Sequence, residues 1–375
     1  MRDVTPIEKL ILEEEAEIVG GMITLIIGEP GAGKTMALTR IVENDIEEDR
    51  IPIWRGQKDC QWILLAAQGL PITFWMHESI EDYRFYLTES RKHNVTETTV
   101  NLRDKEDIDV EFKEWSEAEE VVDGINQGRV HVTYVPGANG DEKDKYFFIK
   151  KYFELCEALV NRNYGDHVSL NADEINDIVP DLQKRPFYDL LMHQYPSIWK
   201  SMRKTNTSKR GIGHGYSEIN HKLINDKSNG IGYMQGARVH RNHSSIDQNI
   251  VNRLNRGEIV VSGWEKGSFE MPKKPYQGIK WMPKTEGVLL KMELEASIPD
   301  VRPEPEDVAT VLDNLPIEAH DLNELWTPKE YADEVGLTTR AVQKKLATNK
   351  LPGIKIGGKW LLSESQLAND EDIPF

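Results

Sequence analysis

Gly28-Glu29-Pro30-Gly31-Ala32-Gly33-Lys34-Thr35 is the stretch of this sequence that decides the fold. It fits the pattern Gly-x-x-x-x-Gly-Lys-Ser/Thr, whose backbone N–H groups turn inward around phosphates. The apolar run at 22–27 predicts a buried strand before it, and residues 36–42 predict a helix that starts at the loop. Lys34 is expected to neutralise phosphates and Thr35 to bind Mg²⁺. The alternative is an accidental glycine-rich turn, but such a turn needs neither a buried strand before it nor a helix after it. The stretch therefore predicts a site for ATP and Mg²⁺.

Composition limits what else the chain can be. It has 375 residues and a formal net charge of −17. That length allows two domains, and that charge argues against a protein that coats nucleic acid, so any DNA contact needs a local basic patch. Cys60 and Cys156 form no CxxC pair and are interpreted as free thiols. There is no signal-peptide pattern, and the most apolar window, 62–76, is too short to span a membrane, so we expect a soluble, cytoplasmic protein.

The pattern along the chain predicts an α/β fold. Strands are expected at 50–54, 71–76, 129–135 and 167–172, with helices at 60–68 and 146–160 between them. This alternation predicts a mainly parallel sheet with helices on both faces. The predicted organisation of the chain is an N-terminal helix at 1–20, the main domain at 21–290, an acidic proline-containing linker at 291–325 and a small C-terminal domain at 326–375.

A strongly acidic segment lies inside the main domain at about 78–128. Such a charge run is usually a solvated face, and the alternative is a lid or a subunit contact.

An acidic pair follows the last of these predicted strands. Asp173 and Glu174 come directly after the run at 167–172. Downstream of a phosphate loop, such a pair is expected to complete the site, with Asp173 in the Mg²⁺ shell and Glu174 deprotonating the attacking water. The alternative is a surface pair that starts the next helix, where acids are common.

The order of the later segments adds a family resemblance. A basic segment at 202–211 is followed by an apolar strand at 230–234 that ends at Gln235, and then by Ser245-Ile246-Asp247. Residues 20–265 resemble the HerA–FtsK group of DNA-pumping ATPases, which have a RecA-like P-loop NTPase fold. The group includes viral genome-packaging ATPases and the zonula-occludens-toxin-like proteins of filamentous phages, and the segment at 245–253 is particularly similar to the latter.

The resemblance implies roles for several residues. Gln235 would be the polar sensor of the γ-phosphate, and Arg210, or Arg203, would be an arginine finger that reaches the neighbouring subunit. A finger supplied by a neighbour implies a ring, expected to be a hexamer. The alternative for Arg210 is a solvated loop cation or a DNA contact. A membrane span, which the toxin-like branch would have, is missing from this sequence.

Two histidines, His240 and His243, lie within one helical turn. Further ligands at short range are missing, so they are interpreted as loop histidines and not as a metal site.

The C-terminal domain carries a helix-turn-helix pattern. Thr327 and Glu330 predict a capping box with Pro328 at the first helical position, Gly336 predicts the turn, and Thr338 predicts the cap of a second helix. Gly357-Gly358 predicts the tip of a two-stranded wing. The segment resembles the excisionase- and MerR-like winged helix-turn-helix family.

This domain supplies the local basic patch. Residues 326–362 contain seven Lys or Arg and three Asp or Glu, a net charge of +4. The residues expected to contact DNA are Thr339, Arg340, Gln343 and Lys344 in the major groove, and Lys355 and Lys359 on the backbone. The alternative is a protein-contact module.

These patterns together predict an ATP-driven motor of a virus or mobile element that moves duplex DNA and carries a DNA-reading tail. A capsid or membrane-assembly protein is the expected partner. One alternative is a phage assembly or secretion ATPase of the toxin-like branch. Another is a DNA-binding regulator in which ATP acts only as a switch.

Overall fold

The structure, a computed structural model, describes most of the chain between residues 23 and 299 and separate parts beyond it. The described residues are 5–6, 23–91, 94–136, 142–162, 166–178, 198, 205–215, 219, 230–239, 246–261, 266–268, 278–282, 288–299, 325–326, 328–329, 332, 338–347, 354–356 and 359–363. They divide into two compact units, one up to residue 299 and one from residue 325.

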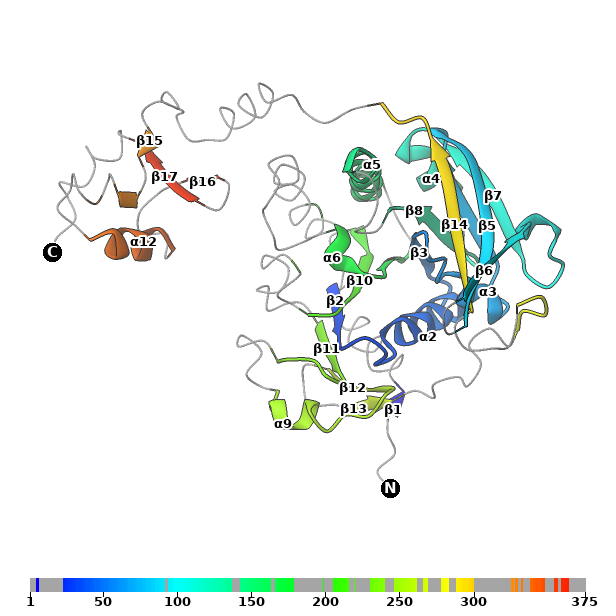
Figure 1. The fold of residues 1–375 in the computed structure, drawn as a ribbon, viewed down its shortest axis with the longest axis horizontal. Helices are drawn as coiled ribbons and strands as arrows, with labels where there is room; N and C mark the ends of the chain where they lie inside the picture. Colours follow the sequence, from blue (N-terminus) through cyan, green and yellow to red (C-terminus); the bar gives the residue numbers. More distant parts are fainter. Residues whose placement is uncertain are drawn as a thin grey trace. The chain divides into compact units, whose positions relative to one another are not determined.

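The first unit is organised around one large sheet (Figure 1). Its strands are β1 (Thr5–Pro6), β2 (Ile23–Ile27), β3 (Ile51–Gly56), β4 (Ile72–His77), β7 (Val110–Trp115), β8 (Val130–Tyr134), β9 (Val168–Ala172), β10 (Thr207–Gly213), β11 (Gly230–Met234), β12 (Glu258–Val261) and β13 (Lys266–Ser268). Their order is β1-β13-β12-β11-β2-β10-β9-β3-β8-β4-β7. From β11 to β7 every neighbouring pair is parallel, whereas β12 is antiparallel to both β11 and β13. The predicted mainly parallel sheet is confirmed.

Helices cover both faces of this sheet. They are α2 (Lys34–Glu47), α3 (Ile63–Ala67), α4 (Ala118–Gly124), α5 (Glu142–Asn161), α6 (Ile175–Ile178) and α9 (Gln248–Val251), with a 3₁₀ turn, η1 (Leu102–Asp104). Figure 1 shows α2 and α5 on opposite sides of β10, β3 and β8. Since both faces are covered, β3, β4, β8 and β9 are buried along their whole length.

A second, antiparallel sheet consists of β14 (Val288–Ala296), β5 (Ile80–Arg91) and β6 (Asn94–Val100), in the order β14-β5-β6. Trp62, just before α3, joins it to the main sheet, because its ring packs edge-on against Phe74 of β4 at 5.4 Å and Phe85 of β5 at 6.3 Å between ring centroids. The acidic segment therefore contributes ordered strands with buried apolar residues as well as solvated charges.

The predicted linker boundary at residue 291 is wrong. Residues 291–296 are the second part of β14, and β14 belongs to the first unit. Leu290 and Met292 of this strand are buried in the core of that unit. The backbone N–H of Ser297 also donates to the carbonyl of Ser79 at 2.8 Å. The alternation of charged and apolar residues in this strand places the charges on its outer face, and the segment therefore has the acidic composition of a linker.

Some of the predicted features lie largely outside the described residues. The helix expected at 1–20 is described only at Thr5–Pro6, which instead pair with β13 as strand β1. The histidines His240 and His243 and the alternative finger residue Arg203 also lie outside the described residues.

The second unit contains β15 (Leu325–Trp326), α12 (Thr339–Ala347), β16 (Ile354–Ile356) and β17 (Lys359–Ser363). The strands form an antiparallel sheet in the order β15-β17-β16. The Thr338 hydroxyl accepts the backbone N–H of Ala341 at 3.2 Å, so Thr338 caps α12 as predicted. The strands β16 and β17 pair on either side of Gly357-Gly358, also as predicted, while the complete winged helix-turn-helix remains a prediction.

Buried His131 of β8 should make the stability of the first unit fall in mild acid. The indole N–H of Trp75 donates to His131 Nδ1 at 3.2 Å, and Nε2 lies 3.0 Å from both the backbone nitrogen and the carbonyl oxygen of Asn126. Burial lowers the pKa of His131 to about 4, helped by Arg129 and Lys113 and opposed by the Asn126 carbonyl and Glu111.

We therefore expect unfolding at pH 5 to be easier than at pH 7. Between the ordinary histidine pKa and pH 4 the unfolded chain binds a proton that the folded chain does not, which costs about 2 kcal/mol of unfolding free energy at pH 5. Urea unfolding of the unaltered chain and of His131→Asn at both pH values measures this, and the variant should lose about 2 kcal/mol less. If the unaltered chain and His131→Asn lost the same unfolding free energy between pH 7 and pH 5, the lowered pKa of His131 would not be the cause.

Candidate nucleotide-binding site

The phosphate loop joins the end of β2 to the start of α2. Gly31 and Gly33 have φ of +83° and +103°, a left-handed conformation that residues with a side chain rarely adopt. The loop is held between two strand ends, because the N–H of Gly28 donates to the Gly213 carbonyl at 3.3 Å and the N–H of Glu29 to the Gln235 carbonyl at 3.0 Å. A Cβ on Gly28 would lie 2.9 Å from Met234 Cβ, so this close approach also requires glycine.

Lys34 folds back over the loop. Its ammonium donates to the carbonyls of Gly28 at 2.9 Å and Glu29 at 3.1 Å, and it lies 3.2 Å from Nδ1 of His214. The side chain is buried at the start of α2. The predicted phosphate-neutralising cation therefore lies beside the loop N–H groups that it is expected to assist.

The structure brings the acidic pair to this loop. Asp173 follows β9, and its Oδ2 accepts the Thr35 hydroxyl at 3.4 Å although β10 lies between β2 and β9. Asp173 is only 2% exposed. Burial, followed by the neighbouring charge of Glu174, raises the pKa of Asp173 to about 7.

Thr35 and Asp173 fit the predicted Mg²⁺. The Oδ1 atom of Asp173 is buried and has no hydrogen-bond partner, which leaves one carboxylate oxygen available beside a hydroxyl. Oxygen donors of this kind suit Mg²⁺, which keeps several waters and is bound through one or two protein groups plus substrate phosphates. Within the described residues there is no group of three or more His, Cys, Asp or Glu that could hold a metal by itself.

Glu174 has an unusual backbone conformation that a buried arginine stabilises. Its φ is +53°, in the left-handed region. The Nη1 atom of Arg55, at the end of β3, donates to the carbonyls of Asp173 at 2.7 Å and Glu174 at 2.8 Å, and Nη2 donates to Pro136 at 2.8 Å. The amide of Gln57 adds a bond to the Asp173 carbonyl at 2.8 Å.

Sequence patterns alone did not identify Arg55 and Gln57 as residues of the site. The available signal was a polar pair at the end of a predicted strand, at the sheet edge where parallel strands carry their functional residues.

His214 is a further residue that the sequence did not single out. It follows β10, and its Nε2 lies 3.1 Å from Oε1 of Glu174 while its Nδ1 faces Lys34. The strand order explains this position, because β10 is the strand between β2 and β9.

Gln235 lies on the other flank of the loop. It follows β11, which neighbours β2 on the side away from β9, and its carbonyl holds the Glu29 N–H. Gln235 is therefore next to the loop, and its expected role as a γ-phosphate sensor stays a prediction.

The expected role of Arg210 as an arginine finger is wrong. Arg210 lies in β10, is 0% exposed, and forms a two-pronged ion pair with Asp45 of α2. Its Nη1 also donates to Oδ1 of Asn171 at 3.3 Å. A guanidinium buried and paired inside its own subunit cannot reach a neighbouring one, nor is it the solvated cation or DNA contact of the alternative.

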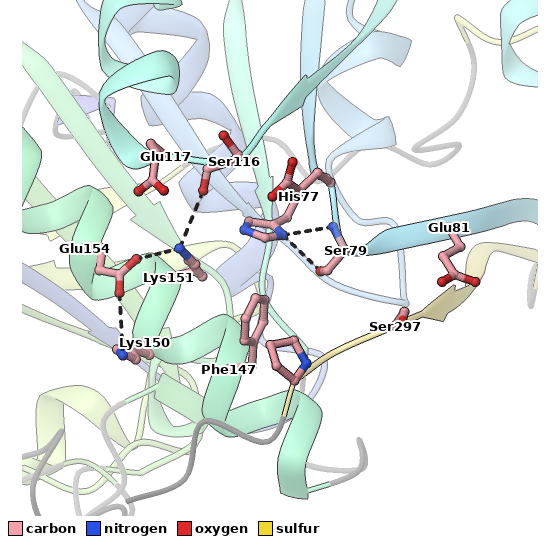
Figure 2. Close-up of a pocket in the computed structure, with 12 residues that line it drawn as sticks. His77, Ser79, Glu81, Ser116, Glu117, Phe147, Lys150, Lys151, Glu154 and Ser297 are labelled. Carbon is pink, nitrogen blue, oxygen red and sulfur yellow. Dashed lines mark hydrogen bonds and ion pairs between the residues drawn. The ribbon is translucent and has the colours of Figure 1, made fainter.

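A separate pocket of about 500 Å³ lies at the ends of β4 and β7 (Figure 2). Its ammonium groups are engaged, since Lys151 lies 3.0 Å and Lys150 4.0 Å from carboxylate oxygens of Glu154. His77 bonds Ser79 at 2.9 Å, and burial lowers its pKa. Four strands lie between β2 and β4, so this pocket is not part of the phosphate-loop site.

The described part of the second unit presents polar residues on α12. Arg340, Gln343 and Lys344 are exposed and Thr339 is half-buried, whereas Val342 and Leu346 face inward. Lys355 and Lys359 lie in β16 and β17, and nothing further is described of their side chains. Contact of this helix face with DNA stays a prediction.

Comparisons with known proteins give distant likenesses only. No protein-family profile matches the sequence, and no curated protein matches it. Among solved structures, the chain is similar to the genome packaging NTPase B204 from Sulfolobus turreted icosahedral virus 2 in complex with ATP-gammaS, at 10% identity and a TM-score of 0.37, over 64% of this chain and 91% of that one.

Two further structures are similar at the same level. VirB4 of Thermoanaerobacter pseudethanolicus has 11% identity and a TM-score of 0.40, over 68% of this chain and 90% of that one. The N-terminal domain of zonular occludens toxin from Neisseria meningitidis has 13% identity and a TM-score of 0.27, over 69% and 99%. These values are too low to assign a function, which must come from the site itself.

Among the helices that the structure describes, none is both long and apolar enough to cross a membrane.

Proposed function

We propose that this chain hydrolyses ATP and uses the energy to move duplex DNA, as a packaging-type motor of a virus or mobile element. The observation that carries the proposal is the contact between Thr35 and Asp173, 3.4 Å apart, across the intervening strand β10. This contact supports one site made of the phosphate loop and the acidic strand end, and His214, which contacts both Lys34 and Glu174, supports it further.

The residues of the site can perform the parts of the reaction. Backbone N–H groups of the loop and the start of α2 bind the phosphates, and Lys34 neutralises them. Mg²⁺, held by Thr35 and Asp173, would supply charge neutralisation at the phosphates. Glu174 orients the attacking water and accepts its proton.

The DNA-handling part of the proposal depends on the second unit. Residues 326–362 carry a net charge of +4 in a chain of −17, and α12 exposes Arg340, Gln343 and Lys344. Cationic and amide side chains on one helix face suit phosphates and base edges. A hexameric ring and a capsid or membrane-assembly partner complete the proposal, and neither Arg210 nor any other described residue is assigned as its arginine finger.

The test measures ATP hydrolysis by the full chain with and without duplex DNA, together with the size of the oligomer. DNA should stimulate hydrolysis. In the double variant Arg340→Ala/Lys344→Ala, the DNA concentration for half-maximal stimulation should rise roughly tenfold, because two contacts are lost, while hydrolysis without DNA is unchanged.

Lys280→Ala, which removes an exposed charge from the first unit, is the matched control and should leave stimulation as it was. DNA binding without any effect on hydrolysis would contradict the motor and leave the ATP-switched regulator. A double variant that responds to DNA as the unaltered chain does would remove α12 from the proposal.

A further inference from the structure

His214 connects the two halves of the candidate site. Its imidazole lies between the Lys34 ammonium, 3.2 Å from Nδ1, and the Glu174 carboxylate, 3.1 Å from Nε2. The His214 side chain is 38% exposed and that of Glu174 is 26% exposed, so this contact lies at the mouth of the site. Lys34 and His214 are 180 positions apart in the sequence, and only the strand order brings them together.

The two contacts agree on one tautomer of the ring. An ammonium group has hydrogens to donate and no acceptor, so Nδ1 must be the unprotonated nitrogen that accepts from Lys34. The ring proton is then on Nε2, where it is donated to the carboxylate of Glu174. A doubly protonated ring would point an N–H at the ammonium and lose this contact.

Glu174 needs such a partner because its backbone alone does not fix its carboxylate. Arg55 donates to the carbonyl oxygens of Asp173 at 2.7 Å and of Glu174 at 2.8 Å. These two hydrogen bonds constrain the backbone of Glu174, whose φ is +53°. The side chain beyond Cα still has rotatable bonds and solvent beside it. A group that must orient a water needs one defined geometry, held by surrounding hydrogen bonds.

We propose that His214 is a positioning residue for Glu174, and that Lys34 fixes the tautomer whose Nε2–H holds the Glu174 carboxylate. The inference rests on the proposed ATP hydrolysis for its kinetic consequence, but not for the tautomer itself. It gives Lys34 a second task besides contact with phosphates.

Two amide substitutions separate the two ring nitrogens. The amide of His214→Gln reaches the position of Nε2 and can still donate to Glu174, whereas the shorter amide of His214→Asn reaches only the position of Nδ1. We expect His214→Asn and His214→Ala to lower kcat for ATP roughly 10- to 100-fold, with KM changed less than about twofold. His214→Gln should recover most of the lost rate.

A merely structural role would give a different result. Unfolding midpoints measured for the three variants would then fall together with kcat, with no advantage for glutamine over asparagine. A kcat of His214→Asn equal to that of the unaltered chain, or of His214→Gln as low as that of His214→Asn, overturns the proposal.

The tautomer is tested separately by ¹⁵N NMR of histidine-labelled full chain, with His214→Gln to assign the signal. The signal of Nδ1 should be that of an unprotonated ring nitrogen and that of Nε2 a protonated one, and Lys34→Ala should mix the two tautomers. A protonated Nδ1 in the unaltered chain overturns the inference whether or not the chain hydrolyses ATP. An unprotonated Nδ1 in a chain without ATP hydrolysis would instead overturn the proposed function alone.

Discussion

The Glu174→Gln variant is expected to hydrolyse ATP at least about 100-fold more slowly than the unaltered chain and to bind ATP with the same affinity. The amide has the shape of the carboxylate but cannot accept a proton from water. Arg55 holds the backbone of Glu174 through carbonyls, which the substitution does not change. The phosphate loop and Lys34 are also untouched, so binding should persist. Phosphate release measures the rate, and calorimetric titration with ATP measures the affinity.

Glu157→Gln is the control for this experiment, because it makes the same chemical change at an exposed position on α5. It should hydrolyse ATP at the rate of the unaltered chain. If Glu174→Gln kept more than about a tenth of that rate, Glu174 would not be the base, since general-base catalysis contributes far more than tenfold.

Asp45→Ala is expected to lower the unfolding free energy by about 3–5 kcal/mol, because it leaves a buried guanidinium without its counter-charge. Asp45 and Arg210 are both 0% exposed. The carboxylate also accepts the hydroxyl of Ser169 at 2.6 Å, so one side chain joins α2 to β9 and β10. Urea unfolding at pH 7 measures the loss.

Two variants sharpen this test. The double variant Asp45→Leu/Arg210→Met removes both charges and should recover most of the lost stability, because an apolar pair can replace a buried ion pair. Glu47→Ala removes an exposed carboxylate from the same helix and should leave the unfolding midpoint in place. A double variant less stable than Asp45→Ala would contradict the view that the unpaired charge causes the loss.

The strand between the two halves of the site could not be predicted from the sequence. Strand β10 reads Thr207-Ser208-Lys209-Arg210-Gly211-Ile212-Gly213, with one large apolar residue, yet it is buried along its length. Periodicity finds a buried strand by its apolar side chains, whereas Arg210 is buried because a carboxylate distant in sequence neutralises it. No strand was therefore predicted at this basic run, and the family resemblance assigned Arg210 the role of an arginine finger, which is wrong.

The parts of the site that the sequence did predict have local signals. The phosphate loop needs its glycines at fixed spacing, and the strand before Asp173 has enough apolar residues to be recognised beside its asparagine. Arg55 could be noticed only as a polar residue at the end of a predicted strand, and the contacts of Arg55 and His214 depend on neighbours that only the strand order supplies. The same limit applies to β14, whose partner strand β5 is about 200 residues earlier in the sequence.

The central claim is that the loop and the acidic strand end form one ATP site. An experimental structure of the Glu174→Gln variant with ATP and Mg²⁺ tests it most directly. We expect the triphosphate at the loop with Lys34 on its phosphates, and the Thr35 hydroxyl and the Asp173 carboxylate both at the metal shell. A nucleotide bound away from residues 28–35, or an Asp173 that has moved out of reach of Thr35 and the metal, would contradict the account.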